Sequence, residues 1–291
     1  MTTDPGHRAT ATTATATTDP GHRAPATAAT PTGPRLRATV HSEWVKFRSV
    51  RSVPAVLLAG AIVLLLGSWA VSAGYRSDWP NMSAADRAAF DPTFQSIRGI
   101  ELAQLLLGAL GVLTVTGEYA SGLIRATFTA TPQRAQVVAV KALVYGAVVW
   151  ALSTVLSFAA FFLGQSLLTA PARHASLGDP GVLRAVLGGG GYLLLIGLLG
   201  LALGVLLRGT AAALAALFGV VLVLPIVAQL LPGEIGGRIG AWLPSSAGEQ
   251  VWTVVPDAGT PLGPWQGAGV LALYVAVAAA AATYRLRRRD V

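Results

Sequence analysis

The sequence predicts an all-α integral membrane protein with six transmembrane helices, and three observations support this fold class. Hydrophobic residues make up 53% of the 291 residues and charged residues only 12%, whereas soluble domains carry about 25% charged residues. The mean hydropathy is +0.60. The hydrophobic residues lie in blocks of about twenty, the length that a helix needs to cross a hydrocarbon core ~30 Å thick.

Charge and cysteine content narrow the class further. The net charge is +8 and cysteine is absent, so the chain has no disulfide, thiolate metal site or thiol redox motif. In a soluble protein such a charge would suggest a nucleic-acid partner. Here the basic residues lie beside the hydrophobic blocks, where membrane topology and anionic lipid head groups account for them. We therefore expect a lipid bilayer as the surroundings and no nucleic-acid partner.

Residues 1–34 form a tail rich in Thr, Ala and Pro. The tail contains a duplicated TTDPGHRA, at 2–9 and 17–24, and no large hydrophobic or aromatic residue follows Met1 within it. Such a segment cannot bury enough apolar surface to offset the entropy of ordering, so we predict a disordered tail. The transmembrane domain is predicted to occupy residues 35–291.

The segment 35–52, RLRATVHSEWVKFRSVRS, is predicted to be a helix that lies in the membrane interface. On a helical wheel its stripe of Leu36, Val40, Trp44 and Phe47 is flanked by basic residues, which is typical of an interfacial helix. Glu43 lies near that stripe, as does Arg51, so the amphipathic pattern is imperfect. A basic flank that only orients the first span is the alternative.

Six spans are predicted to follow, at about 54–74, 100–116, 137–168, 182–207, 211–231 and 267–284. Pro54 is placed as a first-turn proline of the first span, and Pro225 is expected to kink the fifth. The fourth span contains a Gly200-xxx-Gly204 pair. We interpret this pair as a site of intramolecular helix packing rather than of dimerisation.

Lysine and arginine counts beside the spans predict the orientation. With the N-terminus inside, thirteen of these residues flank the inner ends of the spans and six flank the outer ends. Basic residues are enriched in cytoplasmic loops. Both termini are therefore predicted to face the cytoplasm, in a multi-pass protein of the cell membrane.

The connection between the second and third spans, GEYASGLIRATFTATPQRAQVVAVK at 117–141, is unusually rich in charge. Thr131-Pro132 is typical of a helix N-cap followed by a first-turn proline. A third helix that starts there and reaches Leu168 would be about 55 Å long, so we expect it to project beyond the membrane unless it breaks near Gly146 or tilts. An ordinary positively charged loop is the alternative.

Three segments carry a resemblance to a known family: SEWVKFRSVRS at 42–52, the 117–141 connection, and WLPSSAGE at 242–249. Together they resemble the membrane subunit of ATP-binding cassette (ABC) exporters, and most of all the type-2 ABC permeases common in actinobacteria. The resemblance implies an elbow helix at 35–52, a cytoplasmic coupling helix between spans two and three that contacts an ATPase, and a partly re-entrant external gate at 232–266. The residues on the coupling pattern are Glu118, Gly122, Ile124, Arg125, Pro132 and Arg134. Phe128, a further expected contact, stands with Thr129 where many relatives carry leucine and alanine.

The function expected from this resemblance is that of a permease subunit, without enzymatic activity or a cofactor of its own. The chain lacks the G-x-x-x-x-G-K-[ST] phosphate loop, so ATP would be bound by a partner, the cytoplasmic ABC ATPase subunit. The permease would form a homodimer, or a heterodimer with a related permease, and export an amphipathic or lipophilic compound. Glu101, Gln104 and Gln165 are candidates for a cavity, although solvated helix ends explain them as well. An ion-driven secondary transporter and a non-transporting scaffold or immunity protein remain alternatives.

Overall fold

The computed structural model describes residues 32–123, 134–169, 172–232, 234–255 and 261–288. Within these ranges the chain is helical, without a β-strand, and six helices are long and apolar enough to cross a membrane. The all-α membrane fold predicted from hydropathy is therefore confirmed. The expected residues Ile124, Arg125, Phe128 and Pro132 lie outside the described ranges.

The helices that can span a membrane agree closely with the predicted blocks. They are α2 (Ser52–Asp78), α5 (Ile100–Ala120), α7 (Arg134–Leu167), α8 (Val182–Leu207), the fifth span, and α13 (Pro264–Arg288). The fifth span consists of α9 (Thr210–Phe218), a π-helical turn η2 (Gly219–Val223) and α10 (Leu224–Gln229). A proline clashes with the carbonyl four residues before it, and the wider π-helical turn lies where Pro225 would clash. The structure thus has a π-helical turn just before Pro225, while the kink predicted there stays a prediction.

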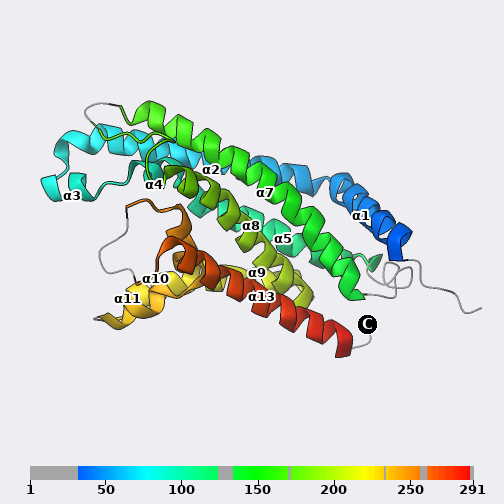
Figure 1. Cartoon of the computed structure of the whole chain (residues 1–291). Helices are drawn as coiled ribbons and strands as arrows, with labels where there is room; N and C mark the ends of the chain where they lie inside the picture. The colour runs from blue at the N-terminus through cyan, green and yellow to red at the C-terminus, as the bar shows by residue number, and fades with distance from the viewer. Residues whose placement is uncertain (1–31, 124–133, 170–171, 233, 256–260, 289–291) are drawn as a thin grey trace, which may run out of the picture.

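The spans form a bundle in which α5 and α8 are central (Figure 1). Of their most hydrophobic 18 residues, 56% and 61% are buried, against 17–28% in the other four spans. The helices α2 and α7 lie along one side of this pair, and α9 and α13 along the other. The four outer spans therefore keep most of their surface for lipid or for a partner chain.

Glycines allow the two central helices to approach closely. A Cβ atom on Gly111 of α5 would lie 2.1 Å from the carbonyl oxygen of Gly197, and one on Gly200 of α8 would lie 2.2 Å from the carbonyl oxygen of Gly108. Real Cβ contacts never come so close, so both positions require glycine. Gly200 therefore packs within the chain, as expected from the sequence.

Short helices cap one end of the bundle. They are η1 (Trp79–Asn81), α3 (Ala84–Ala89) and α4 (Pro92–Ile97) between the first two spans, and α11 (Glu234–Ala241), α12 (Pro244–Glu249) and η3 (Gln250–Trp252) before α13. The helix α1 (Thr32–Ser49) lies at the opposite end, as does the C-terminal end of α13. We call these the α3 end and the α1 end.

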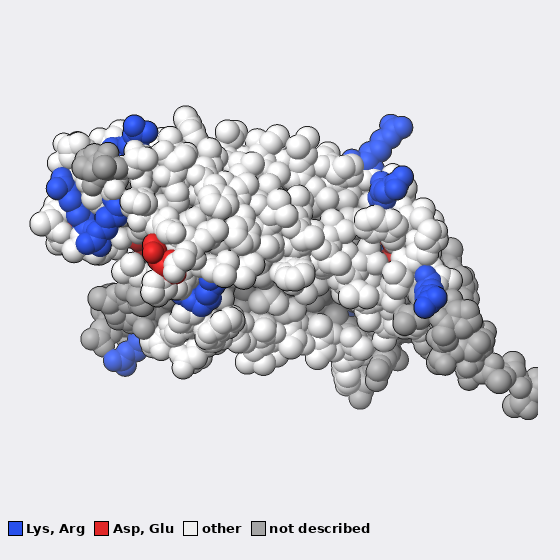
Figure 2. Space-filling model, turned by 45° about the horizontal axis from the view of Figure 1, so that its top comes forward, with Lys and Arg blue, Asp and Glu red and all other residues white. Residues whose placement is uncertain are grey.

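The middle parts of the six described spans contain no Asp, Glu, Lys or Arg. On the face shown in Figure 2, Lys and Arg side chains gather at both ends, and the broad band between them lacks them. This band is the part of the surface that a hydrocarbon core would cover. The α1 end is the one that the charge count predicts to be cytoplasmic.

Candidate functional site

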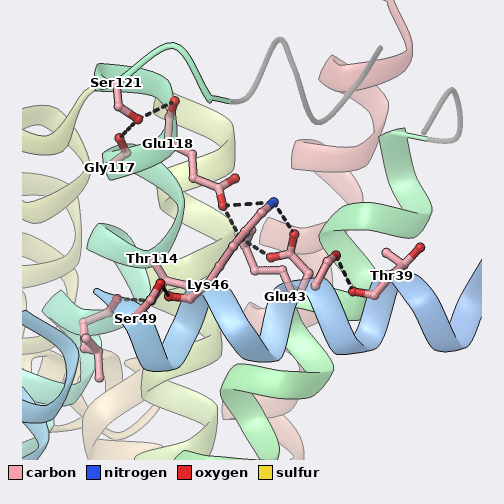
Figure 3. A network of polar contacts seen from close by, with 11 residues as sticks. Thr39, Glu43, Lys46, Ser49, Thr114, Gly117, Glu118 and Ser121 are labelled. Atoms are coloured by element: carbon pink, nitrogen blue, oxygen red, sulfur yellow. Dashed lines mark hydrogen bonds and ion pairs between the residues drawn. The ribbon is translucent and has the colours of Figure 1, made fainter. Parts of the chain in front are cut away.

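Four charged side chains from three helices meet at the α1 end, and Figure 3 shows part of this network. Lys141 of α7 donates to Glu43 Oε2 of α1, and to Glu118 Oε1 of α5 at 2.8 Å. Lys46 of α1 donates to Glu43 Oε1 at 2.7 Å and lies 3.7 Å from Glu118 Oε1. Two carboxylates thus face two ammonium groups, and we call these four residues the charge network.

The network is largely shielded from water. Glu43 is 3% exposed and Lys141 5%, whereas the side chain of Lys46 is 36% exposed at the rim. Removing one partner of a buried ion pair leaves an uncompensated charge, which costs about 3–5 kcal/mol. Glu43 and Lys141 therefore each depend on the other where α1 meets α7, while Lys46 completes the network from the solvent side.

Burial and the two lysines act in opposite directions on the pKa of Glu43. Burial raises it, because the charged form loses hydration, and the neighbouring ammonium groups of Lys141 and Lys46 lower it. The lysines prevail, so the pKa of Glu43 lies below its ordinary value of 4.5. Glu43 is accordingly an anion at neutral pH.

The spacing of residues on α1 and α7 explains why these helices meet here. Glu43 and Phe47 are one turn apart on α1, and Lys141 and Tyr145 are one turn apart on α7, so each pair shares a helix face. The ring of Phe47 contacts that of Tyr145 edge-on, with centroids 6.3 Å apart. The hydroxyl of Tyr145 in turn donates to the carbonyl oxygen of Leu107 on α5. A polar and an aromatic contact thus fix α1 across the ends of α5 and α7.

A cavity of about 270 Å³ adjoins the network, between α1, α2, α5 and α7. All four network residues line it. The rest of the lining is mostly apolar, with contributions from Phe47, Val50, Val53, Leu110, Leu113, Leu123 and Val144. The α1 end therefore combines fixed charges with an apolar recess.

The expected coupling residues divide into described and undescribed ones. Glu118 belongs to the network, and Gly122 follows α5 with a φ of +73°, a left-handed conformation that ends helices and favours glycine. Arg134 is the first residue of α7. Ile124, Arg125, Phe128 and Pro132 lie outside the described residues, so their role stays a prediction. The helix α7 itself continues unbroken past Gly146.

The three candidate cavity residues lie at the other end of the bundle, away from the network. Glu101 pairs with Arg98, 3.0 Å apart. Gln104 is 7% exposed; it donates to the carbonyl oxygen of Glu101 and accepts from the hydroxyl of Tyr192. Gln165 donates to Pro92 O and Ser96 Oγ and accepts from Ala175 N. Gln104 is thus a buried link between α5 and α8 rather than a solvated helix end.

At the α3 end, two charged residues hold the segment 250–255 through its backbone. Asp91 accepts from the amides of Val254 and Val255, at 2.7 and 2.8 Å, and also caps α4. Arg184 of α8 donates to the carbonyl oxygens of Val251 and Thr253, at 2.7 and 2.9 Å. The segment 250–255, which we call the outer segment, is therefore closed over the bundle.

An aromatic contact completes this closure. The ring of Trp252 is 1% exposed and stacks on Phe94 of α4, with centroids 4.5 Å apart. The sequence alone does not indicate that Asp91, Arg184 and Trp252 act together, because their contacts join residues far apart in the chain. The sequence signal that was available is the N-cap pattern of Asp91 followed by Pro92.

Glu43 is likewise a residue whose role the sequence did not reveal. In the sequence, Glu43 only interrupts the apolar stripe of 35–52, and its role becomes clear only from its contact with Lys141.

Among the residues that the structure describes, no group of three or more His, Cys, Asp or Glu side chains could hold a metal ion. The sequence matches no family model and no curated protein.

Proposed function

We propose that the chain is the transmembrane permease subunit of an ABC exporter, driven by a separate ATPase subunit. The observation that carries the proposal is the charge network, because it ties α1 to both helices that flank residues 121–133. Glu118 stands near the end of α5 and Lys141 near the start of α7. A partner that presses on the connection between them would move α1, α5 and α7 together.

The helix α7 is suited to transmit such a movement. It has 34 residues without interruption, which corresponds to about 51 Å against a hydrocarbon core of ~30 Å. A displacement at its first turns would therefore be carried to the α3 end. There Gln165 of α7 bonds to Pro92 and Ser96 of α4, the helix that Asp91 caps.

The closed outer segment supports an exporter as well. A transporter that works by alternating access needs a gate that can close the substrate pathway on one side of the membrane. It also needs an element on the other side that couples this gate to the energy source. The bonds that Asp91 and Arg184 make to the outer segment go to its backbone groups, so these contacts can be released and remade as a unit. The predicted cargo is an amphipathic or lipophilic compound, and the predicted assembly is a dimer of permeases with two ATPase subunits in the cell membrane.

The test is recruitment of an ATPase. Co-expressed with a cognate P-loop ABC ATPase, the chain should co-purify with that protein, and the pair should hydrolyse ATP while the chain alone does not. If the connection is a coupling element, Glu118 and Arg125 are expected to form charge-assisted bonds that position it, and losing one partner of a buried charge pair costs about 2–5 kcal/mol. Glu118→Ala or Arg125→Ala should then lower the ATPase retained per permease about tenfold or more. Arg37→Ala, an exposed arginine on α1, is the matched control. If both variants retain as much ATPase as the control, the connection is an ordinary basic loop and the proposal fails.

The ion-driven carrier is tested with the same protein. Buried ionisable residues also occur in proton- and sodium-coupled carriers, and Glu43, Glu118 and Lys141 are such residues. In liposomes, the lone chain should leave an imposed proton gradient intact, as read by an internal pH dye. Dissipation of the gradient that Glu43→Gln abolishes would favour the carrier instead.

A further inference from the structure

The cavity beside the charge network is elongated along the spans. Its lining on α5 extends from Leu110, in the middle of that helix, to Ser121 just past its end. Eleven residues of helix correspond to about 17 Å. The cavity therefore runs from the depth of the hydrocarbon core to the membrane surface, the direction in which a lipid chain lies.

Polarity changes along this length. At the deep end the lining is Leu110, Leu113, Thr114 and Val144. The charged side chains and the serines Ser49, Ser52 and Ser121 all lie at the surface end, beside the apolar residues Phe47, Val50, Val53 and Leu123. Leu113 is 37% exposed and Val50 49% exposed, so part of the lining is open to the surroundings. An apolar chain with a polar head would match this gradient from one end to the other.

The charge at the surface end is positive. The two carboxylates and two ammonium groups of the network compensate each other. The junction of α1 and α2 forms one wall of the cavity through Ser49, Val50, Ser52 and Val53. Arg48 and Arg51 belong to this same junction and are exposed. They leave a net positive charge beside the polar end of the cavity, at the level of the head groups.

We propose that the cavity holds one acyl chain of an anionic phospholipid whose phosphate lies against Arg48 and Arg51. The apolar depth accounts for the chain, and the two exposed guanidinium groups account for a negative head group, since arginine binds phosphate through several N–H groups at once. Bound there, the lipid wedges between α1 and α5. It would therefore stabilise the joint that the charge network forms.

The experiment is native mass spectrometry of the purified full-length chain, mixed in detergent with equal amounts of dioleoyl phosphatidylglycerol and dioleoyl phosphatidylcholine. One phosphatidylglycerol should be retained per chain, with a preference over phosphatidylcholine of roughly tenfold, since each basic residue at the surface favours an anionic lipid. Arg48→Gln with Arg51→Gln should abolish the preference. Arg76→Gln, an exposed arginine at the opposite end of α2, should leave it unchanged.

The acyl chain is tested separately. Leu113→Trp fills the cavity and should reduce retention of both lipids at least several-fold, whereas Leu58→Trp, on the exposed face of α2, should not. Glycerol 3-phosphate, which has the head group without chains, should not compete. Equal retention of the two lipids, full competition by glycerol 3-phosphate, or an unaffected Leu113→Trp variant would each overturn the proposal. The readout involves neither an ATPase nor transport, so it can succeed or fail independently of the proposed function.

Discussion

Lys141 of α7 donates a hydrogen bond to Glu43 of α1, a residue 98 positions earlier in the chain. Both side chains are almost fully buried, and Lys141 also bonds to Glu118 of α5. Lys141 is thus the residue on which three helices converge. The stability of the α1 end and the coupling proposed for it depend on this ammonium group.

Lys141→Met should destabilise the protein by about 3–5 kcal/mol, because Glu43 and Glu118 are then left buried without their shared cation. The measurement is thermal unfolding of the purified chain in detergent. The triple variant with Glu43→Gln and Glu118→Gln should recover most of the loss, since uncharged partners need no cation. Lys46→Met, at the exposed rim, should cost about 1 kcal/mol or less. A mild effect of Lys141→Met alone would show that water reaches the network.

Acid should weaken the fold through Glu43. Its pKa is lowered in the folded protein, because Lys141 and Lys46 outweigh burial, so its ionised form stabilises the fold above its ordinary pKa of 4.5. That contribution is lost as the pH falls below 4.5 towards the lowered value. The free energies of unfolding of the parent and of Glu43→Gln should therefore converge as the pH falls from about 5 to about 3. A difference that stays constant over this range would contradict the prediction.

Asp91→Ala should loosen the outer segment, since it removes the acceptor for the amides of Val254 and Val255 together with the cap of α4. The chain has no cysteine, so Thr253→Cys provides a single labelling site. Its reaction with a maleimide should become several-fold faster when Asp91→Ala is added. Asp86→Ala, a change of an exposed residue on the neighbouring α3, should leave the labelling rate unchanged. If Asp86→Ala and Asp91→Ala changed the rate equally, Asp91 would not specifically hold the outer segment in place.

Gly200→Ala should separate α5 from α8. The added Cβ would lie 2.2 Å from the carbonyl oxygen of Gly108, and overpacking of this kind costs about 1–3 kcal/mol. Gly191→Ala on the same helix meets nothing within 4 Å and should be neutral or slightly stabilising. The measurement is the melting temperature of each variant in detergent, and that of Gly200→Ala should be the lower. Equal melting temperatures would mean that the central helices are not in close contact.

The orientation can be tested with two further cysteines. Asn81→Cys at the α3 end should react with an impermeant maleimide in whole cells, and Ser121→Cys at the α1 end only after permeabilisation. Both residues are exposed, and the basis is the excess of Lys and Arg beside the inner ends of the spans. The reverse pattern would place the proposed coupling connection outside the cell and exclude an ATPase contact there.

The sequence by itself determined the fold class, the six spans and the expectation of an interfacial helix before the first. These features depend on composition and on local periodicity, which are properties of short windows. The span limits deviate by a few residues, for example in α2, which continues to Asp78. Polar residues such as Ser77 at the end of a hydrophobic block do not end a helix. They indicate only where the helix extends beyond the hydrocarbon core.

Only the tertiary structure decided which charges meet. From the sequence, Glu43 only makes the amphipathic pattern of 35–52 imperfect, because nothing near it in the sequence indicates that Lys141 lies against it. The same holds for Asp91 and the amides of Val254 and Val255, more than 160 residues away. A buried charge is tolerated only where a partner compensates its lost hydration, and that partner is set by the packing of whole helices. Hydropathy therefore locates the spans, while the close approach of α5 to α8 and of α1 to α7 selects the residues that act together.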